Sequence, residues 1–162
     1  MTEHENRVVV CPSCVVLNRV PAARLEDGGH CGRCHGPLFL GKPVELTSAN
    51  FEAHGKSSDI PLLIDFWAAW CGPCRQMESS FAALAVKVEP HLRLGKVDTD
   101  AEQGLAARFG IQSIPSLILV EKGQQIARTA GAMPEAALLQ WIETAMASHG
   151  RHFPTKPVRS TF

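Results

Sequence analysis

The chain has 162 residues, of which 45% are hydrophobic and 20% charged, a composition typical of one globular domain with a small appendage. Lysine plus arginine number 16, as do aspartate plus glutamate, so the formal net charge is zero and we expect no nucleic-acid partner. The longest apolar runs, such as 60–64 and 117–120, are far shorter than the roughly 18 residues that a membrane span needs.

The N-terminal residues lack the basic-then-apolar pattern of an export signal. We therefore expect a cytoplasmic protein with no membrane association. Thiols stay reduced in that compartment, so the six cysteines are expected to be metal ligands or catalysts rather than structural bridges.

Four of the cysteines lie in the first 40 residues, as the pairs Cys11/Cys14 and Cys31/Cys34. The 16 residues between the pairs match the spacing of a four-thiolate zinc site. A segment of about 40 residues cannot build a sufficient core alone, and a metal would stabilise it. We predict that residues 1–40 form a small zinc-ribbon-like module with one structural Zn²⁺. Two extra redox dithiols, or disulfides, are the alternative.

Histidines and arginines surround these cysteines. His30 and His35 are adjacent to ligand cysteines, and neighbouring residues rarely bind one metal comfortably, so we expect neither to be a ligand. Four thiolates with Zn²⁺ carry a net charge of −2. The arginines that could neutralise it are Arg7, Arg19, Arg24 and Arg33.

The rest of the chain divides into a linker with the first strand (41–46), an α/β domain (47–147) and a tail (148–162) expected to be disordered. Apolar runs followed by turn residues predict strands, and apolar residues at helical spacing predict helices. The alternation predicts a mixed sheet with helices on both faces. Strands are expected at 44–46, 62–67, 92–97, 116–120 and 125–129, and helices at 47–54, 73–88, 101–109 and from Pro134 onward.

The third cysteine pair, Cys71 and Cys74, lies between a buried strand and a helix. At the helix N-terminus, unpaired N–H groups and the helix dipole stabilise a thiolate, so Cys71 is the expected nucleophile. Cys74, one turn later, can attack the resulting mixed disulfide. Gly72 keeps the approach open, and Pro73 suits the first helical turn because it lacks an N–H.

Asp65 interrupts the apolar strand before this pair. A buried carboxyl has a raised pKa and could accept the proton of Cys74, whereas the alternative is an exposed edge-strand residue. Lys96, on the next predicted strand, either lies near this carboxylate or is solvated at its strand's end. Pro115 begins a strand, and its spacing alone does not favour a cis peptide.

Residues 63–74, with the sequence LIDFWAAWCGPC, resemble the active-site segment of the thioredoxin family. Ile114-Pro115 resembles the family's cis-proline loop, and Gly131-Ala132 its second substrate-facing turn. The double cysteine pair resembles the zinc-binding extension of the bacterial thioredoxin 2 subfamily. The resemblance covers about residues 8–147.

This resemblance implies the thioredoxin fold and a protein disulfide reductase. It implies Cys71 as nucleophile, Cys74 as resolving thiol, Asp65 as buried base and a cis Pro115. Thioredoxin reductase, using FAD and NADPH, would recharge the dithiol, and we expect a monomer with no bound organic cofactor. A flat apolar surface would receive disulfide-containing proteins through Trp70, Gly72, Pro73, Ile114, Gly131 and Ala132.

One position departs from the family pattern: Ser79 replaces a proline that kinks the active-site helix in many thioredoxins, so a straighter helix is expected. Two other functions stay open. An isomerase or oxidant would need a much less negative redox potential. A redox-responsive zinc sensor, or a binding module, would make the dithiol secondary.

Overall fold

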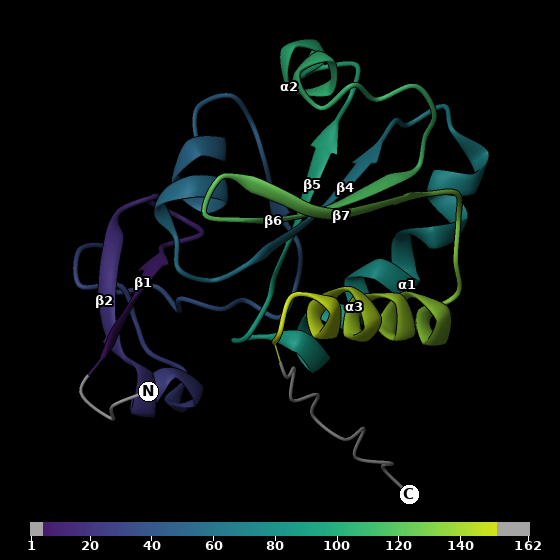
Figure 1. Ribbon diagram of the computed structural model, residues 1–162. Coiled ribbons are helices and arrows are strands. Elements are labelled where there is room, and N and C mark those ends of the chain that lie inside the picture. Colours follow the sequence, from purple (N-terminus) through teal and green to yellow (C-terminus); the bar gives the residue numbers. More distant parts are fainter. Residues whose placement is uncertain (1–4, 152–162) are drawn as a thin grey trace, which may run out of the picture.

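The computed structural model describes residues 5–151, which form two sheets (Figure 1). The smaller is an antiparallel pair of strands, β1 (Asn6–Val10) and β2 (Leu17–Pro21), followed by a 3₁₀ helix, η1 (Ala22–Asp27). The sequence predicted no strands here, because both are short and partly exposed. Most of the expected disordered tail lies outside the described residues.

The larger sheet has five strands in the order β3-β5-β4-β6-β7. Strands β3, β5 and β4 are parallel, and β6 and β7 run antiparallel to their neighbours. This arrangement confirms the predicted mixed sheet. The strand bounds are β3 (Val44–Glu45), β4 (Leu62–Trp67), β5 (Arg93–Asp98), β6 (Ser116–Glu121) and β7 (Gln124–Ala130).

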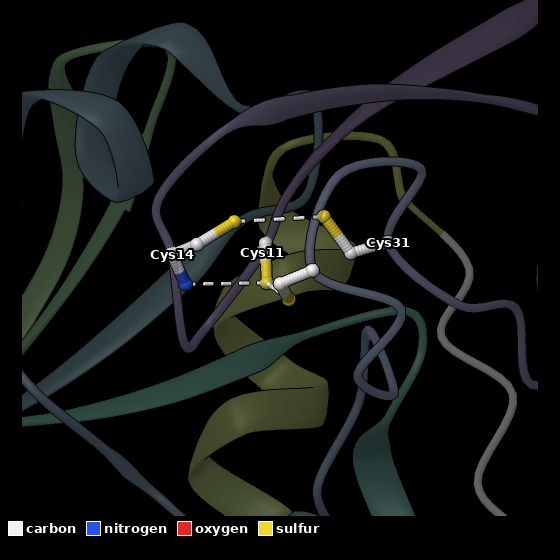
Figure 2. A group of neighbouring side chains, drawn as sticks. Cys11, Cys14 and Cys31 are labelled. Carbon is white, nitrogen blue, oxygen red and sulfur yellow. Dashed lines mark hydrogen bonds between the residues drawn. The ribbon is translucent and has the colours of Figure 1, made fainter.

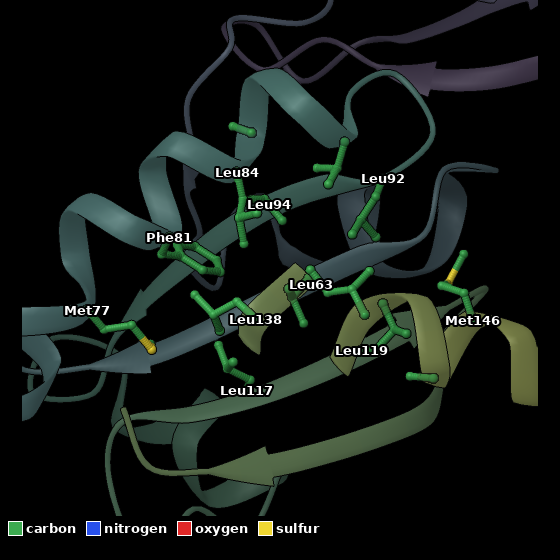
Figure 3. Close-up of a cluster of buried hydrophobic side chains, with 14 residues drawn as sticks. Leu63, Met77, Phe81, Leu84, Leu92, Leu94, Leu117, Leu119, Leu138 and Met146 are labelled. Carbon is green, nitrogen blue, oxygen red and sulfur yellow. The ribbon is translucent and has the colours of Figure 1, made fainter. Parts of the chain in front are cut away.

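Helices α1 (Gly72–Val88) and α3 (Glu135–Ser148) cover one face of this sheet (Figure 1). Their apolar residues recur at helical spacing and meet alternate residues of the strands in one buried cluster (Figure 3). Burying each large side chain contributes roughly 1.5–3 kcal/mol, so this cluster anchors α1 firmly on the sheet. It includes Leu63, Met77, Phe81, Leu84, Leu94, Leu117, Leu119 and Leu138.

The opposite face is covered by α2 (Gln103–Arg108) and by a π-helical turn, η2 (Ala53–Ser57). The expected helix 47–54 therefore continues further than predicted, to Ser57. Gly95 in the middle of β5 allows close packing on this face, because a Cβ there would lie 2.4 Å from the side chain of Leu46. No helix among the described residues is both long and apolar enough to cross a bilayer.

The N-terminal segment, residues 5–43, contacts the larger sheet at the starting ends of β4 and β5. Arg93, the first residue of β5, is 2% exposed, and its Nη2 donates hydrogen bonds to the carbonyls of Val10 (3.0 Å) and Leu38 (2.9 Å). Burial lowers the pKa of Arg93 to about 10, so the guanidinium stays charged at neutral pH. This buried cation therefore joins the two sheets.

Replacing Arg93 with Met should loosen the N-terminal segment. Two buried carbonyls would lose a charged donor, so we expect the free energy of unfolding to fall by about 2–4 kcal/mol and the β1 amides to exchange faster with solvent. Urea unfolding and hydrogen exchange measure the two effects. The exposed Arg19→Met is the matched control and should cost less than about 0.5 kcal/mol. Equal costs for both variants would contradict this role.

Candidate functional site

Cys71 and Cys74 lie at the start of α1, immediately beyond the end of the buried strand β4. Cys71 is the N-cap residue, and its Sγ accepts a hydrogen bond from the backbone N–H of Cys74 (3.2 Å). The two residues form a disulfide across the first turn, with their Cα atoms 5.3 Å apart. The N–H that the helix leaves unpaired thus points at the Cys71 sulfur, where it would stabilise a thiolate after reduction.

A groove of about 460 Å³ opens beside Cys71. Of the six predicted surface residues, Trp70, Gly72, Pro73 and Ile114 line it. Trp70 is 71% exposed, and its indole N–H donates to Asp100 Oδ2 (3.0 Å), so the ring is held at the rim. The surface is therefore hollowed rather than flat. Its far wall comes from residues that the sequence analysis did not name: Thr99, Ala106, Ile111, Gln112 and Ser113.

The loop before β6 approaches the disulfide from the other side. The Ile114–Pro115 peptide is cis, and the Ile114 carbonyl oxygen lies 3.7 Å from Cys71 Sγ. Gly131 donates its backbone N–H to the Pro115 carbonyl (2.9 Å) with a φ of +101°, which favours glycine. Gly131 and Ala132 are exposed beside this loop but do not line the groove.

Asp65 lies on β4 beneath α1 and is 1% exposed. Its Oδ1 has no hydrogen-bond partner among the described residues. Burial raises the pKa of this carboxyl to about 7, and the charge of Glu78 adds to the rise while that of Lys96 opposes it. The carboxyl therefore gains and loses its proton near neutral pH.

Lys96 is opposite Asp65 in the register of β4 and β5, but its ammonium points elsewhere. Its Nζ lies 4.4 Å from the centre of the Trp67 ring and 3.6 Å from Glu78 Oε1. No ion pair within the described part of the chain joins Lys96 to Asp65. The first sequence interpretation is right in that Lys96 lies near Asp65 on the adjacent strand and its charge opposes the rise in the pKa of that carboxyl, but its ammonium pairs with Glu78 instead.

The four N-terminal cysteines form a separate cluster, in which all four sulfurs lie within 4.8 Å of one another. The sulfurs of Cys11 and Cys34 are 3.5 Å apart. Those of Cys14 and Cys31, joined by a dashed line in Figure 2, are 3.6 Å apart. Tetrahedral Zn–S bonds of about 2.3 Å would separate the sulfurs by about 3.8 Å. The geometry fits a four-thiolate metal site.

The two halves of this cluster have the same backbone shape. In each, the residue after the second cysteine, Val15 or His35, has a positive φ (68° and 63°) and donates its N–H to the carbonyl of the first cysteine. Backbone N–H groups also point at sulfur, from Ser13 to Cys11 Sγ and from Arg33 to Cys31 Sγ (both 3.4 Å). Such donors stabilise thiolates. The positive φ of a β-branched valine had no sequence signal.

The charges around the cluster differ from expectation. Arg7 pairs with Glu5 and Arg24 with Asp27, so these predicted neutralising arginines have other partners. The buried cation near the cluster is Arg93, whose pKa is lowered by burial and raised by the charge of Cys11. Sequence reasoning missed it because Arg93 is distant from Cys11 along the chain. Neither histidine, His30 nor His35, belongs to the cluster.

Comparisons with known proteins agree with this geometry. The thioredoxin family model matches residues 42–144, and the model described as "Thioredoxin 2, N-terminal" matches residues 10–36. Thioredoxin C-3 of Corynebacterium nephridii is 43% identical over 84% of this chain and 93% of its own length.

Two further matches are a fusion protein and a solved structure. The bifunctional thioredoxin reductase/thioredoxin of Mycobacterium leprae is 40% identical over 62% of this chain and 22% of its own length. The structure of a mutant thioredoxin from Halobacterium salinarum matches with a TM-score of 0.58 and 30% identity, over 65% of this chain and 91% of that chain. With a family model covering most of the chain, a disulfide at the start of α1 and an N-terminal cysteine cluster, this chain belongs to the thioredoxin family of thiol–disulfide oxidoreductases and has the N-terminal zinc-ribbon segment of thioredoxin 2.

Proposed function

We propose that this chain is a protein disulfide reductase that works through the Cys71–Cys74 dithiol. The observation that carries the proposal is the pairing of these two cysteines across the first turn of α1, with Cys71 lining an open groove. A dithiol so close to ring closure can pass two electrons to a substrate and become the disulfide without moving the helix.

In the first step the Cys71 thiolate attacks one sulfur of a substrate disulfide, and the other substrate sulfur leaves as a thiolate. The mixed disulfide then lies in the groove beside Trp70 and Ile114. Cys74 loses its proton and attacks Cys71 Sγ, which releases the second substrate sulfur as a thiolate. The substrate has gained two electrons, and the protein is left as the Cys71–Cys74 disulfide.

Asp65 is the proposed acceptor for the Cys74 proton, through a water molecule. A carboxyl with a pKa of about 7 changes protonation at the pH where the reaction runs, as efficient general acid–base catalysis needs. The cis Pro115 and the preceding residue Ile114 would align the substrate backbone, and Gly72, Pro73, Gly131 and Ala132 would complete the docking surface.

The dithiol must be reduced again after each turnover, and we propose thioredoxin reductase, using FAD and NADPH, as the electron donor. The fusion of these two activities in the Mycobacterium leprae relative supports this pairing. We further propose a cytoplasmic monomer that binds disulfide-containing proteins and no organic cofactor.

For the N-terminal cluster we propose one structural Zn²⁺ held by Cys11, Cys14, Cys31 and Cys34 within residues 1–40. When bound, the metal would supply a closed four-thiolate crosslink and no open coordination position for a substrate. The cluster adjoins the starting ends of β4 and β5, whereas the dithiol follows the far end of β4. This separation favours a structural role over electron exchange with the dithiol.

Cys71→Ser should lower the rate of insulin-disulfide reduction by more than about 10³-fold, because the attacking thiolate is lost. Cys74→Ser should instead accumulate mixed disulfides with substrate proteins, visible on non-reducing gels. In the double variant Cys71→Ser/Cys74→Ser these adducts should vanish. Full activity of Cys71→Ser, or adducts that persist in the double variant, would overturn the proposed roles.

Asp65→Asn should stabilise the oxidised protein at high pH. The pKa of this carboxyl is raised from 3.8 to about 7 on folding, so the folded state binds the proton more tightly and stability falls as pH rises through this window. At about 1.4 kcal/mol per pH unit, the variant should gain up to about 4 kcal/mol at pH 8 and little at pH 3.5.

Urea unfolding at the two pH values measures the Asp65→Asn effect, with the exposed Asp27→Asn as control. A gain that does not change with pH would be inconsistent with a raised pKa at Asp65.

Metal analysis should find one zinc per chain. Removing it with a strong chelator should speed amide exchange in β1 and β2, because metal binding is coupled to folding of the segment, while insulin reduction keeps more than about half of its rate. Cys34→Ser should also speed amide exchange in β1 and β2. Substoichiometric metal in freshly purified protein, or unchanged exchange after chelation, would refute the structural zinc site.

A further inference from the structure

Lys96 has two carboxylates near it, Asp65 and Glu78, and its ammonium pairs with only one of them. Asp65 is its register partner on the adjacent parallel strand, so both side chains project from the same face of the sheet, beneath α1. Glu78 projects from α1 and takes the ammonium at 3.6 Å. The ammonium also lies 4.4 Å from the centre of the Trp67 ring, a cation–π contact.

Within residues 5–151, few other charged groups lie near Asp65. From α1 the charge that acts on it is that of Glu78, and Cys71 and Cys74 do not titrate while they form the disulfide. From β5 it faces Lys96, and from β6 its register partner is the apolar Leu117. The Lys96 ammonium is therefore the main movable charge near the buried Asp65 carboxyl.

We propose that Glu78 is a positioning residue for the resolving step, because it draws the Lys96 ammonium away from Asp65 and so keeps the buried carboxyl able to hold a proton. This inference rests on the proposed role of Asp65 as proton acceptor. An exposed residue of α1, Glu78, would thereby influence proton transfer at Asp65, which lies on the sheet beneath the helix.

The direction of the effect follows from the charges. Without the Glu78 carboxylate, its own repulsion of a charged Asp65 disappears and Lys96 is free to turn toward Asp65. Both changes favour the ionised carboxyl, so its pKa should fall below about 7. Glu78 is 63% exposed at its side chain, so water screens the pair and the shift should be modest.

The test is a ¹³C NMR titration of the Asp65 carboxyl in the oxidised full-length protein, where neither Cys71 nor Cys74 titrates. Glu78→Gln should lower the midpoint by roughly half a pH unit. The exposed Glu143→Gln on α3 removes the same charge elsewhere and should leave the midpoint unchanged. Lys96→Met should raise the midpoint, and in that background Glu78→Gln should shift it by less than half as much.

Two results would overturn the proposal: no shift with Glu78→Gln, or a shift of the same size with and without Lys96. Should Lys96→Met fail to fold, Lys96→Gln supplies the same background. A second measurement separates this inference from the proposed function. In protein that keeps Cys74, the rate at which the mixed disulfide on Cys71 resolves at pH 6 should rise roughly twofold in Glu78→Gln. If the Asp65 midpoint shifts but the resolution rate does not rise, the effect of Glu78 on Lys96 stands, and the role of Asp65 as proton acceptor is contradicted.

Discussion

The chemistry of this molecule depends on where the first turn of α1 directs its unpaired N–H groups. Strand β4, buried at every residue but Trp67, precedes that turn, and the Cys74 N–H lies 3.2 Å from the Cys71 sulfur. The hydrophobic cluster beneath α1 keeps the turn in place, because Phe81 and Leu84 cannot leave the sheet without exposing a large apolar area. The groove, the approach of the Ile114 carbonyl and the position of Asp65 all take their geometry from this fixed turn.

Strand β5 carries two cations, Arg93 and Lys96, that point in opposite directions. Arg93 and Lys96 are three residues apart, so they project from opposite faces of the sheet, and roughly 10 Å of strand separates their Cα atoms. Arg93 turns toward the carbonyls of Val10 and Leu38, and Lys96 turns toward Glu78 on α1. One strand thus supports both the N-terminal segment and the environment of the dithiol, while the two sulfur centres stay at different ends of the sheet.

Local pattern was sufficient to predict the mixed sheet, its helices on both faces and the two cysteine sites. These features depend on apolar periodicity and on fixed spacings, which a single sequence records directly. The burial of Asp65 was also predictable, because its neighbours on the strand are all apolar. Hairpin β1–β2 was missed because Asn6 and Leu17 begin short, half-exposed strands whose order depends on the cysteine turns between them.

The other features that the sequence did not predict are contacts between residues distant in sequence. Nothing in the local pattern indicates that Arg93 bonds to Val10, or that Lys96 prefers Glu78 and Trp67 to its register partner. The groove wall beyond Cys71 was missed for the same reason, since its residues come from the turn after β5, from α2 and from the loop that follows α2.

The most direct test of the central claim is the rate at which Cys71 of the reduced protein reacts with iodoacetamide as a function of pH, with the modified site identified by mass spectrometry. If the α1 N-terminus stabilises the thiolate, Cys71 should react before Cys74, with a midpoint at or below about 7.5 rather than the ordinary value of about 8.5. A midpoint at the ordinary value, or faster modification of Cys74, would contradict the account.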